Sequence, residues 1–134
     1  GCRVPIPWSS DPKGAFGFST NDSLKPEEAW LPQSSWWGKY SVDSQDGVEG
    51  STLSMYREAL ALRKLEPGLG DGPMEWIEAG KDVVAFERPG DFACYINFGA
   101  PMQLPSNSQI LVASGPVTGH TLPTDTAVWL RLVP

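Results

Sequence analysis

Residues 51–64 have the sequence Ser-Thr-Leu-Ser-Met-Tyr-Arg-Glu-Ala-Leu-Ala-Leu-Arg-Lys, and this stretch separates two parts of the chain that differ in character. Its apolar side chains recur every three or four residues, which is the spacing of one face of a helix. Ser51 or Thr52 can cap the N-terminus, and Pro67-Gly68 ends the segment. The sequence therefore predicts an amphipathic helix over residues 51–64.

Residues 1–50 show no regular helix or strand pattern, because proline and glycine interrupt them at short intervals. One helical turn is expected at residues 26–30, where proline stands first. A disordered linker is poor in aromatic residues, so we expect this loop to lie over a larger body or to line a site. Aromatic burial is the only large favourable term expected to hold it. Four of the six tryptophans lie in this loop: Trp8, Trp30, Trp36 and Trp37.

From Gly70 onward the apolar period changes to two, and short runs alternate with turn residues. Several short strands of this kind predict an antiparallel β-sandwich. The expected strands are residues 74–79, 83–88, 92–98, 101–105, 109–113 and 127–133.

Composition narrows the functional class. A net charge of −6 argues against a nucleic-acid partner, and no apolar run is long enough to predict a membrane span. No signal peptide is visible, and we expect a cytoplasmic protein. The start at Gly1-Cys2-Arg3 suggests processing, truncation or engineering. Cys2 and Cys94 are expected to be free thiols, and these two cysteines with the single His120 predict no metal site. Nothing in the sequence implies a cofactor.

Two further groups of polar residues are expected to be solvent-exposed and not to form a functional site. Asp43, Asp46 and Glu49 form an acidic stretch before the helix, and we expect a solvated turn there rather than a catalytic pair. His120 lies in a polar loop and is expected at the surface.

Four segments follow one another in a recognisable order. Arg3-Val-Pro-Ile-Pro-Trp8 fits an Arg-x-Pro-x-x-Trp pattern, and Ala15-Phe-Gly-Phe18, Trp30-Leu-Pro32 and the helix of residues 51–64 follow it. In this order they resemble the α-glucosidases, oligo-1,6-glucosidases and trehalose synthases of the α-amylase superfamily (glycoside hydrolase family 13). The opening residues resemble the actinobacterial type most.

The resemblance implies an α+β chain with two parts. Residues 1–68 would be the end of the catalytic domain, with the long loop after strand eight and the last helix of a (β/α)8 barrel. Residues 69–134 would be an antiparallel β-sandwich C-terminal domain. The family's catalytic carboxylates lie on earlier strands, so no catalytic residue is expected in this chain, and the rest of the barrel is the expected partner.

The implied function is that of a retaining, exo-acting α-glucosidase acting on oligosaccharides, of which this chain alone would be an inactive part. Arg3 and Phe16 are the implied substrate-binding residues. A guanidinium suits this role because its fork can hold a carboxylate and a sugar hydroxyl together. The four tryptophans would either stack on sugars or, as we favour, pack the loop onto the barrel.

Two alternatives stay open. One is a transglycosylating relative, such as a trehalose or isomaltulose synthase. The other is a stand-alone carbohydrate-binding or interaction module.

Overall fold

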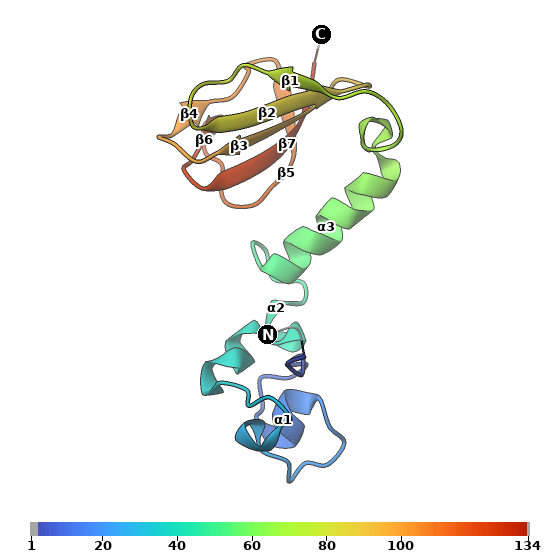
Figure 1. The fold of residues 1–134 in the computed structure, drawn as a ribbon, viewed down its shortest axis with the longest axis vertical. Coiled ribbons are helices and arrows are strands. Elements are labelled where there is room, and N and C mark those ends of the chain that lie inside the picture. Colours follow the sequence, from blue (N-terminus) through green and yellow to red (C-terminus); the bar gives the residue numbers. More distant parts are fainter. Residues whose placement is uncertain (1–2, 134) are drawn as a thin grey trace. The chain divides into compact units, whose positions relative to one another are not determined.

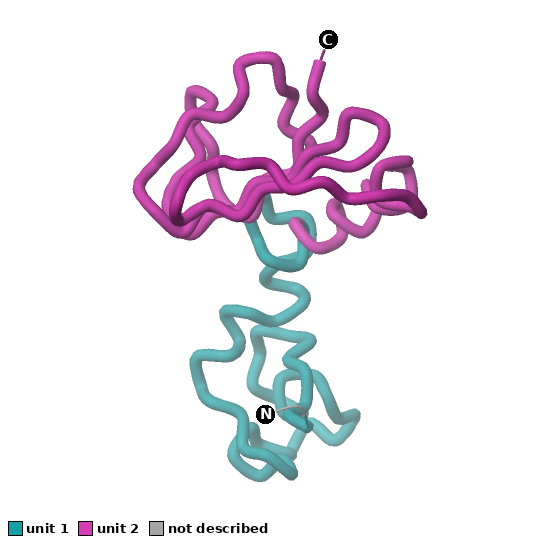
Figure 2. The backbone as a smooth tube through the Cα atoms, turned by 45° about the horizontal axis from the view of Figure 1, so that its top comes forward, with its two compact units in different colours: residues 1–54 teal, residues 55–134 magenta. Residues whose placement is uncertain are grey.

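The computed structural model describes residues 3–133, and the chain divides into two compact units, residues 1–54 and 55–134 (Figure 2). Cys2, expected to be a free thiol, lies outside the described residues. The helical turn predicted at residues 26–30 is confirmed as η1, a short 3-10 helix over Pro26–Glu28. The first unit is built of short helical turns: α1 (Lys13–Gly17), η1 (Pro26–Glu28), η2 (Ser35–Tyr40) and α2 (Val42–Gln45) (Figure 1).

Backbone hydrogen bonds between distant parts of the loop hold the first unit together. The amides of Val42 and Asp43 donate to the carbonyl oxygens of Pro7 and Trp8 at 3.0 and 3.1 Å. The expectation that aromatic burial alone would hold this loop is therefore wrong. Because these bonds join residues more than thirty positions apart, no local sequence pattern predicts them.

The predicted helix is confirmed as α3 (Thr52–Leu65), shifted by one residue at each end. The Ser51 hydroxyl oxygen accepts a hydrogen bond from the Ser54 amide at 3.1 Å and so caps the helix. No residue of α3 is buried, and the side chains of Tyr56 and Leu60 are 59% and 57% exposed. The apolar face that the sequence predicted is therefore present but open.

The second unit carries the antiparallel sheets. After η3 (Pro67–Leu69), five strands pair in the order β1-β2-β3-β7-β5, and β4 and β6 form a separate two-stranded sheet (Figure 1). The strand bounds are β1 (Glu75–Ile77), β2 (Val83–Arg88), β3 (Phe92–Asn97), β4 (Met102–Gln103), β5 (Ser108–Ala113), β6 (Thr121–Leu122) and β7 (Thr126–Leu132). Each predicted strand is confirmed. The sequence missed β6, because a two-residue strand has no period to detect.

The core of this unit lies between the two sheets. Val128 and Leu130 of β7, both at most 1% exposed, pack in one cluster with Leu122 of β6 and Leu104. Alternate residues of β7 are buried, as expected where one face of a strand lies against a core. The β4–β6 pair therefore covers one face of the five-stranded sheet.

The opposite face of the sheet carries a row of aromatic residues. Trp76 and Phe86, paired across β1 and β2, meet edge to face with ring centroids 6.2 Å apart, and Phe92 and Trp129 do the same at 5.8 Å. Trp76 is 68% exposed and Val84 is 40% exposed. This face is thus apolar and only partly covered.

Candidate functional site

The most unusual backbone in the first unit is a left-handed run over residues 14–17. Gly14, Ala15, Phe16 and Gly17 have φ angles of 60°, 54°, 56° and 74°. A residue other than glycine costs about 1–2 kcal/mol in this region, so Ala15 and Phe16 are strained. Backbone strain of this kind gathers at binding and catalytic sites, which makes this run the starting point of a candidate site.

The carbonyl oxygen of Phe16 fixes the run to the preceding motif. It accepts hydrogen bonds from the backbone amides of Trp8 and Ser9 at 2.8 and 2.9 Å. Ala15 in turn donates to the carbonyl oxygen of Leu24 at 3.0 Å. The Arg-x-Pro-x-x-Trp and Ala-Phe-Gly-Phe motifs, separate in the sequence, are therefore one hydrogen-bonded piece of structure.

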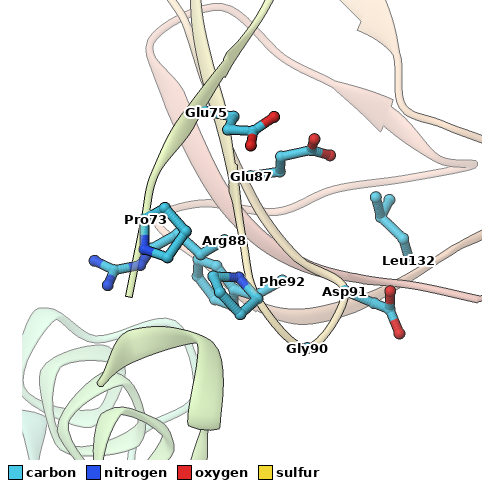
Figure 3. A pocket seen from close by; sticks show the side chains of 9 residues that line it. Pro73, Glu75, Glu87, Arg88, Gly90, Asp91, Phe92 and Leu132 are labelled. Carbon is cyan, nitrogen blue, oxygen red and sulfur yellow. The ribbon is translucent and has the colours of Figure 1, made fainter. Parts of the chain in front are cut away.

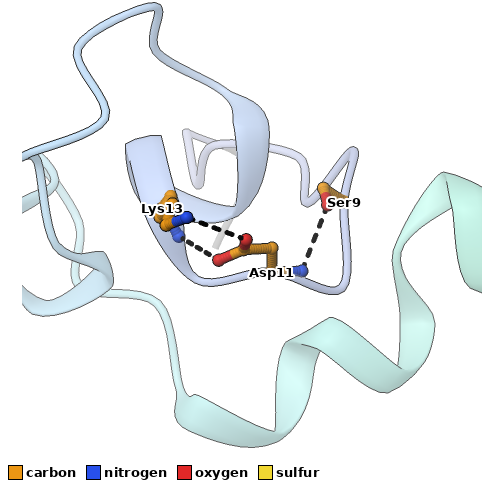
Figure 4. Close-up of polar contacts among 3 residues, drawn as sticks. All are labelled: Ser9, Asp11 and Lys13. Atoms are coloured by element: carbon orange, nitrogen blue, oxygen red, sulfur yellow. Dashed lines mark hydrogen bonds and ion pairs between the residues drawn. The ribbon is translucent and has the colours of Figure 1, made fainter.

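A polar turn leads the chain into this run (Figure 4). Ser9 Oγ accepts from the Asp11 amide at 3.1 Å, and Asp11 Oδ1 accepts from the Lys13 amide at 3.0 Å. Lys13 Nζ lies 3.7 Å from Asp11 Oδ2, but both side chains are more than half exposed, so the ion pair adds little stability. The two bonds to backbone amides set the direction in which the chain enters the left-handed run.

Phe16 lies in the wall of a small pocket. It is 3% exposed, and its ring packs over Gly38, where an added Cβ would lie 3.1 Å from a ring carbon. The pocket has a volume of about 270 Å³. Its lining combines apolar and polar side chains: Ser10, Pro12, Phe16, Pro26, Glu27, Gln33 and Ser35.

Gln33 is the residue of this pocket that the sequence did not reveal. It is 4% exposed, and its Nε2 donates to the carbonyl oxygen of Pro5 at 2.9 Å. Its Oε1 is buried and has no hydrogen-bond partner among the described residues. A lone amide in an irregular loop carries no periodic signal, so only the three-dimensional structure identifies it.

Arg3 is exposed and makes no hydrogen bond or ion pair within residues 3–133. It lies two residues before Pro5, whose carbonyl oxygen Gln33 holds. The structure therefore places Arg3 at the start of an anchored segment and leaves its guanidinium available to a partner.

Three of the four tryptophans of the first unit expose more than half of their surface: Trp8 at 52%, Trp30 at 83% and Trp36 at 55%. Trp37 is half-buried and meets Trp36 edge to face at 5.9 Å. Most of this aromatic surface thus finds no partner inside the unit.

The acidic stretch has a structural role at Asp43. Its carboxylate accepts hydrogen bonds from the Ser41 hydroxyl and, at 3.0 Å, from the Ser10 amide. These bonds, the one from Ser41 first, hold the pKa of Asp43 below its ordinary value of 3.8. Asp43 is exposed, as a solvated turn requires, but it also ties two loop segments together.

His120 and Cys94 lie in the second unit. His120 Nε2 lies 2.9 Å from the carbonyl oxygen of Ser108 and 3.2 Å from its hydroxyl oxygen, and the residue is half-buried rather than at the surface as expected. Cys94 is a buried free thiol, as predicted, and burial raises its pKa to about 11. Cys94 is therefore an unreactive core residue.

A second pocket, of about 310 Å³, opens at the edge of the five-stranded sheet (Figure 3). Glu75 and Glu87 are direct partners across β1 and β2, and their side chains extend on the same side of the strands (Figure 3). Arg88, also in the lining, uses its guanidinium to donate to the carbonyl oxygens of Gly70 and Gly72. Like charges directly opposite each other destabilise a strand pair. The Nε atom of Arg88 is buried and has no hydrogen-bond partner among the described residues.

Residues 3–133 contain neither a cluster of metal ligands nor a membrane-spanning helix. No group of three or more histidine, cysteine, aspartate or glutamate side chains is placed to hold a metal ion. No helix in the described part of the chain is long and apolar enough to cross a membrane.

Comparison with known proteins supports the family resemblance seen in the sequence. No protein-family model matches the chain. Over 88 residues it is 36% identical to the "Probable alpha-glucosidase" of Rhizobium meliloti (strain 1021), a match that spans 66% of this chain and 14% of that protein. The chain belongs to the α-amylase superfamily. It corresponds to the C-terminal part of members of this superfamily.

Solved structures show the same fold. Trehalose-6-phosphate hydrolase of Bacillus licheniformis superimposes with a TM-score of 0.72 over 99% of this chain, at 16% identity. Trehalulose synthase of Pseudomonas mesoacidophila MX-45 gives 0.70 over 97% at 24% identity, and an isomaltulose synthase mutant of Erwinia rhapontici NX5 gives 0.73 over 98% at 19% identity. The chain spans about a quarter of each of these proteins, 25–26%. The antiparallel sheet matches the C-terminal domains of these superfamily members.

Proposed function

We propose that the chain is the C-terminal portion of a retaining, exo-acting α-glucosidase that hydrolyses terminal α-linked glucose from oligosaccharides. The observation that carries the proposal is the 36% identity, across 66% of this chain, to a relative named as a probable α-glucosidase. The Arg3–Trp8 and Ala15–Phe18 motifs support it, because backbone hydrogen bonds join them and the first motif begins with an exposed arginine.

In this proposal Arg3 and Phe16 serve the substrate subsite. Arg3 would pair with a carboxylate from elsewhere in the barrel and donate to a sugar hydroxyl. Phe16, held in strained backbone, would shape the wall beside it. The nucleophile and the general acid of a retaining glycosidase are two carboxyl groups on either side of the scissile bond, and we assign neither of them to this chain.

The remainder of a (β/α)8 barrel is the proposed partner. The open aromatic surface in the first unit supports this, with Trp30 83% exposed, as does the open face of α3. Apolar area gains about 25 cal/mol for each Å² removed from water, so these faces favour a covering surface. We accordingly propose residues 1–68 as the end of the barrel domain and residues 69–134 as the C-terminal domain.

Two alternatives make different predictions. A transglycosylating relative is supported by the likeness to trehalulose and isomaltulose synthases, but it is not favoured over hydrolysis. A stand-alone binding module would bury its own tryptophans, and the exposure of Trp8, Trp30 and Trp36 argues against it.

The test compares the full-length polypeptide with residues 1–134 alone. The full-length protein should release nitrophenol from an aryl α-glucoside, with α-glucose as the first product by NMR, whereas the 134-residue chain should release none above buffer. Incubation with sucrose separates the alternatives, because a synthase would yield an isomeric disaccharide and a hydrolase would yield monosaccharides. Turnover by the purified 134-residue chain that survives repurification would contradict the proposal.

A further inference from the structure

Gln45, the last residue of α2, forms a hydrogen-bonded bridge between two helical elements of the first unit. Its Nε2 donates to the carbonyl oxygen of Tyr40, at the end of η2, at 2.6 Å. Its Oε1 accepts from the amide of Leu53, in the first turn of α3, at 3.2 Å. A carboxylate could only accept and an ammonium group could only donate, so the amide side chain is suited to both contacts.

The main chain of Gln45 adds to the attachment on α3. Its carbonyl oxygen accepts hydrogen bonds from the hydroxyl groups of Ser51 and Ser54 at 2.7 and 3.3 Å. The covalent connection is less constraining, because residues 46–50 are exposed and their two glycines, with φ angles of 70° and 75°, have open space around them. The contacts of Gln45 therefore fix α2 on the start of α3 more directly than the connecting loop does.

The segment that Gln45 attaches to α3 holds the first motif of the candidate site. This support segment comprises η2 and α2, residues 35–45. The amides of Val42 and Asp43 in this segment donate to two carbonyl oxygens of the Arg3–Trp8 motif at 3.0 and 3.1 Å. A continuous series of hydrogen bonds thus runs from α3 through Gln45 and the support segment to the motif.

We propose that Gln45 is a positioning residue for the proposed α-glucosidase activity: it holds the support segment on α3 and so sets where Arg3 meets the substrate. This inference rests on the proposed function, in which Arg3 serves the substrate subsite. A misplacement of about 1 Å can cost on the order of a hundredfold in rate. A residue that served as a helix cap alone would instead change the stability of α3 and leave the kinetics normal.

Gln45→Glu in the full-length polypeptide separates the bridge from the cap. The carboxylate still accepts from the Leu53 amide, at a helix end that favours negative charge, but it cannot donate to Tyr40. We expect kcat/KM for an aryl α-glucoside to fall about tenfold, part of the loss that misplacement can cause, with the melting temperature unchanged. Gln109→Glu, the same change at an exposed position of β5, is the control and should have normal kinetics. Normal kinetics of Gln45→Glu overturns the inference.

Coupling to Arg3 distinguishes positioning from an unrelated effect on the enzyme. Residues that act through one another have effects that do not add. Gln45→Glu should therefore lower kcat/KM by less in an Arg3→Lys background than in the wild-type protein. Equal losses in the two backgrounds would show that Gln45 does not act through Arg3.

Hydrogen exchange in the full-length polypeptide tests the attachment without measuring activity. In Gln45→Met, which loses both side-chain contacts, the amides of Val42 and Asp43 should exchange about fivefold faster, the effect of losing one neutral hydrogen bond on local opening. Faster exchange at Leu53 alone would make Gln45 a helix cap and overturn the inference. If the full-length protein hydrolyses no α-glucoside, the proposed function fails, and exchange at Val42 and Asp43 still decides whether Gln45 holds the support segment.

Discussion

Arg131 Nη2 donates to Glu66 Oε2 at 2.5 Å and so joins strand β7 to the residue that follows α3. The two side chains differ sharply in exposure, with Arg131 46% exposed and Glu66 only 4%. Close by, an added Cβ at Gly68 would lie 2.5 Å from the Cβ of Phe92. The end of the helix is therefore fixed to the sheet by one ion pair and one tight backbone contact.

The unequal burial of this pair predicts unequal effects of mutation. Arg131→Met leaves the Glu66 carboxylate buried without its partner and should cost about 1–2 kcal/mol, less than a fully buried pair because Arg131 is half exposed. Glu66→Gln leaves Arg131 in contact with water and should cost less. Hydrogen exchange at the Leu69 amide, which donates to the carbonyl oxygen of Glu66, measures both effects. The reverse order of the two variants would show that burial does not govern this pair.

Arg3→Lys in the full-length protein tests the proposed role of the exposed arginine. Lysine keeps the charge but loses the planar fork, and loss of one charge-assisted contact to a buried partner costs on the order of 2–5 kcal/mol. We expect kcat/KM to fall by at least about thirtyfold, the lower end of that range, with the melting temperature unchanged. Arg63→Lys, at an exposed position of α3, is the matched control. Normal kinetics of the Arg3 variant at normal stability would leave Arg3 a surface residue.

The left-handed run predicts a contrast between two glycines. Gly14 and Gly47 have φ angles of 60° and 70°, so alanine is strained by about 1 kcal/mol at either position. An added Cβ at Gly14 would lie 2.4 Å from the carbonyl oxygen of Ser19, whereas at Gly47 it meets nothing within 4 Å. Gly14→Ala should therefore lower both the melting temperature and kcat/KM of the full-length protein well beyond Gly47→Ala. Similar effects of the two variants would mean that the run tolerates displacement.

The sequence predicted what depends on local periodicity. The helix at residues 51–64 and the strand at residues 83–88 were predicted to within about one residue. The helix places apolar residues on one face over several turns, and the strand alternates its side chains between two faces. The motif around Phe16 was recognised from its order along the chain. Its left-handed backbone was not, because Ala15 and Phe16 are residue types that seldom adopt positive φ.

The polar parts of the candidate site could not be predicted for a different reason. Gln33 forms a hydrogen bond with Pro5, which lies 28 residues away in the sequence, and Asp43 forms one with Ser10, which lies 33 residues away. Neither contact produces a recognisable pattern in the spacing of nearby residues. Such contacts exist only once the loop has closed, which is why the pocket emerged from the structure alone.

The Asp43 carboxylate gives the last prediction, which concerns pH. The Ser41 hydroxyl and the Ser10 amide hold its pKa below 3.8 in the folded protein, so the unfolded chain binds a proton at higher pH than the folded one. The contribution of Asp43 to stability is therefore complete above the unfolded pKa and is lost as the pH falls through the lower, folded value. In NMR titrations the Ser10 amide shift should change with a midpoint below 3.8. Asp43→Asn keeps an acceptor for that amide but cannot titrate, so its Ser10 shift should stay flat over the same range. A wild-type midpoint at or above the ordinary value would show that these hydrogen bonds do not favour the charged form.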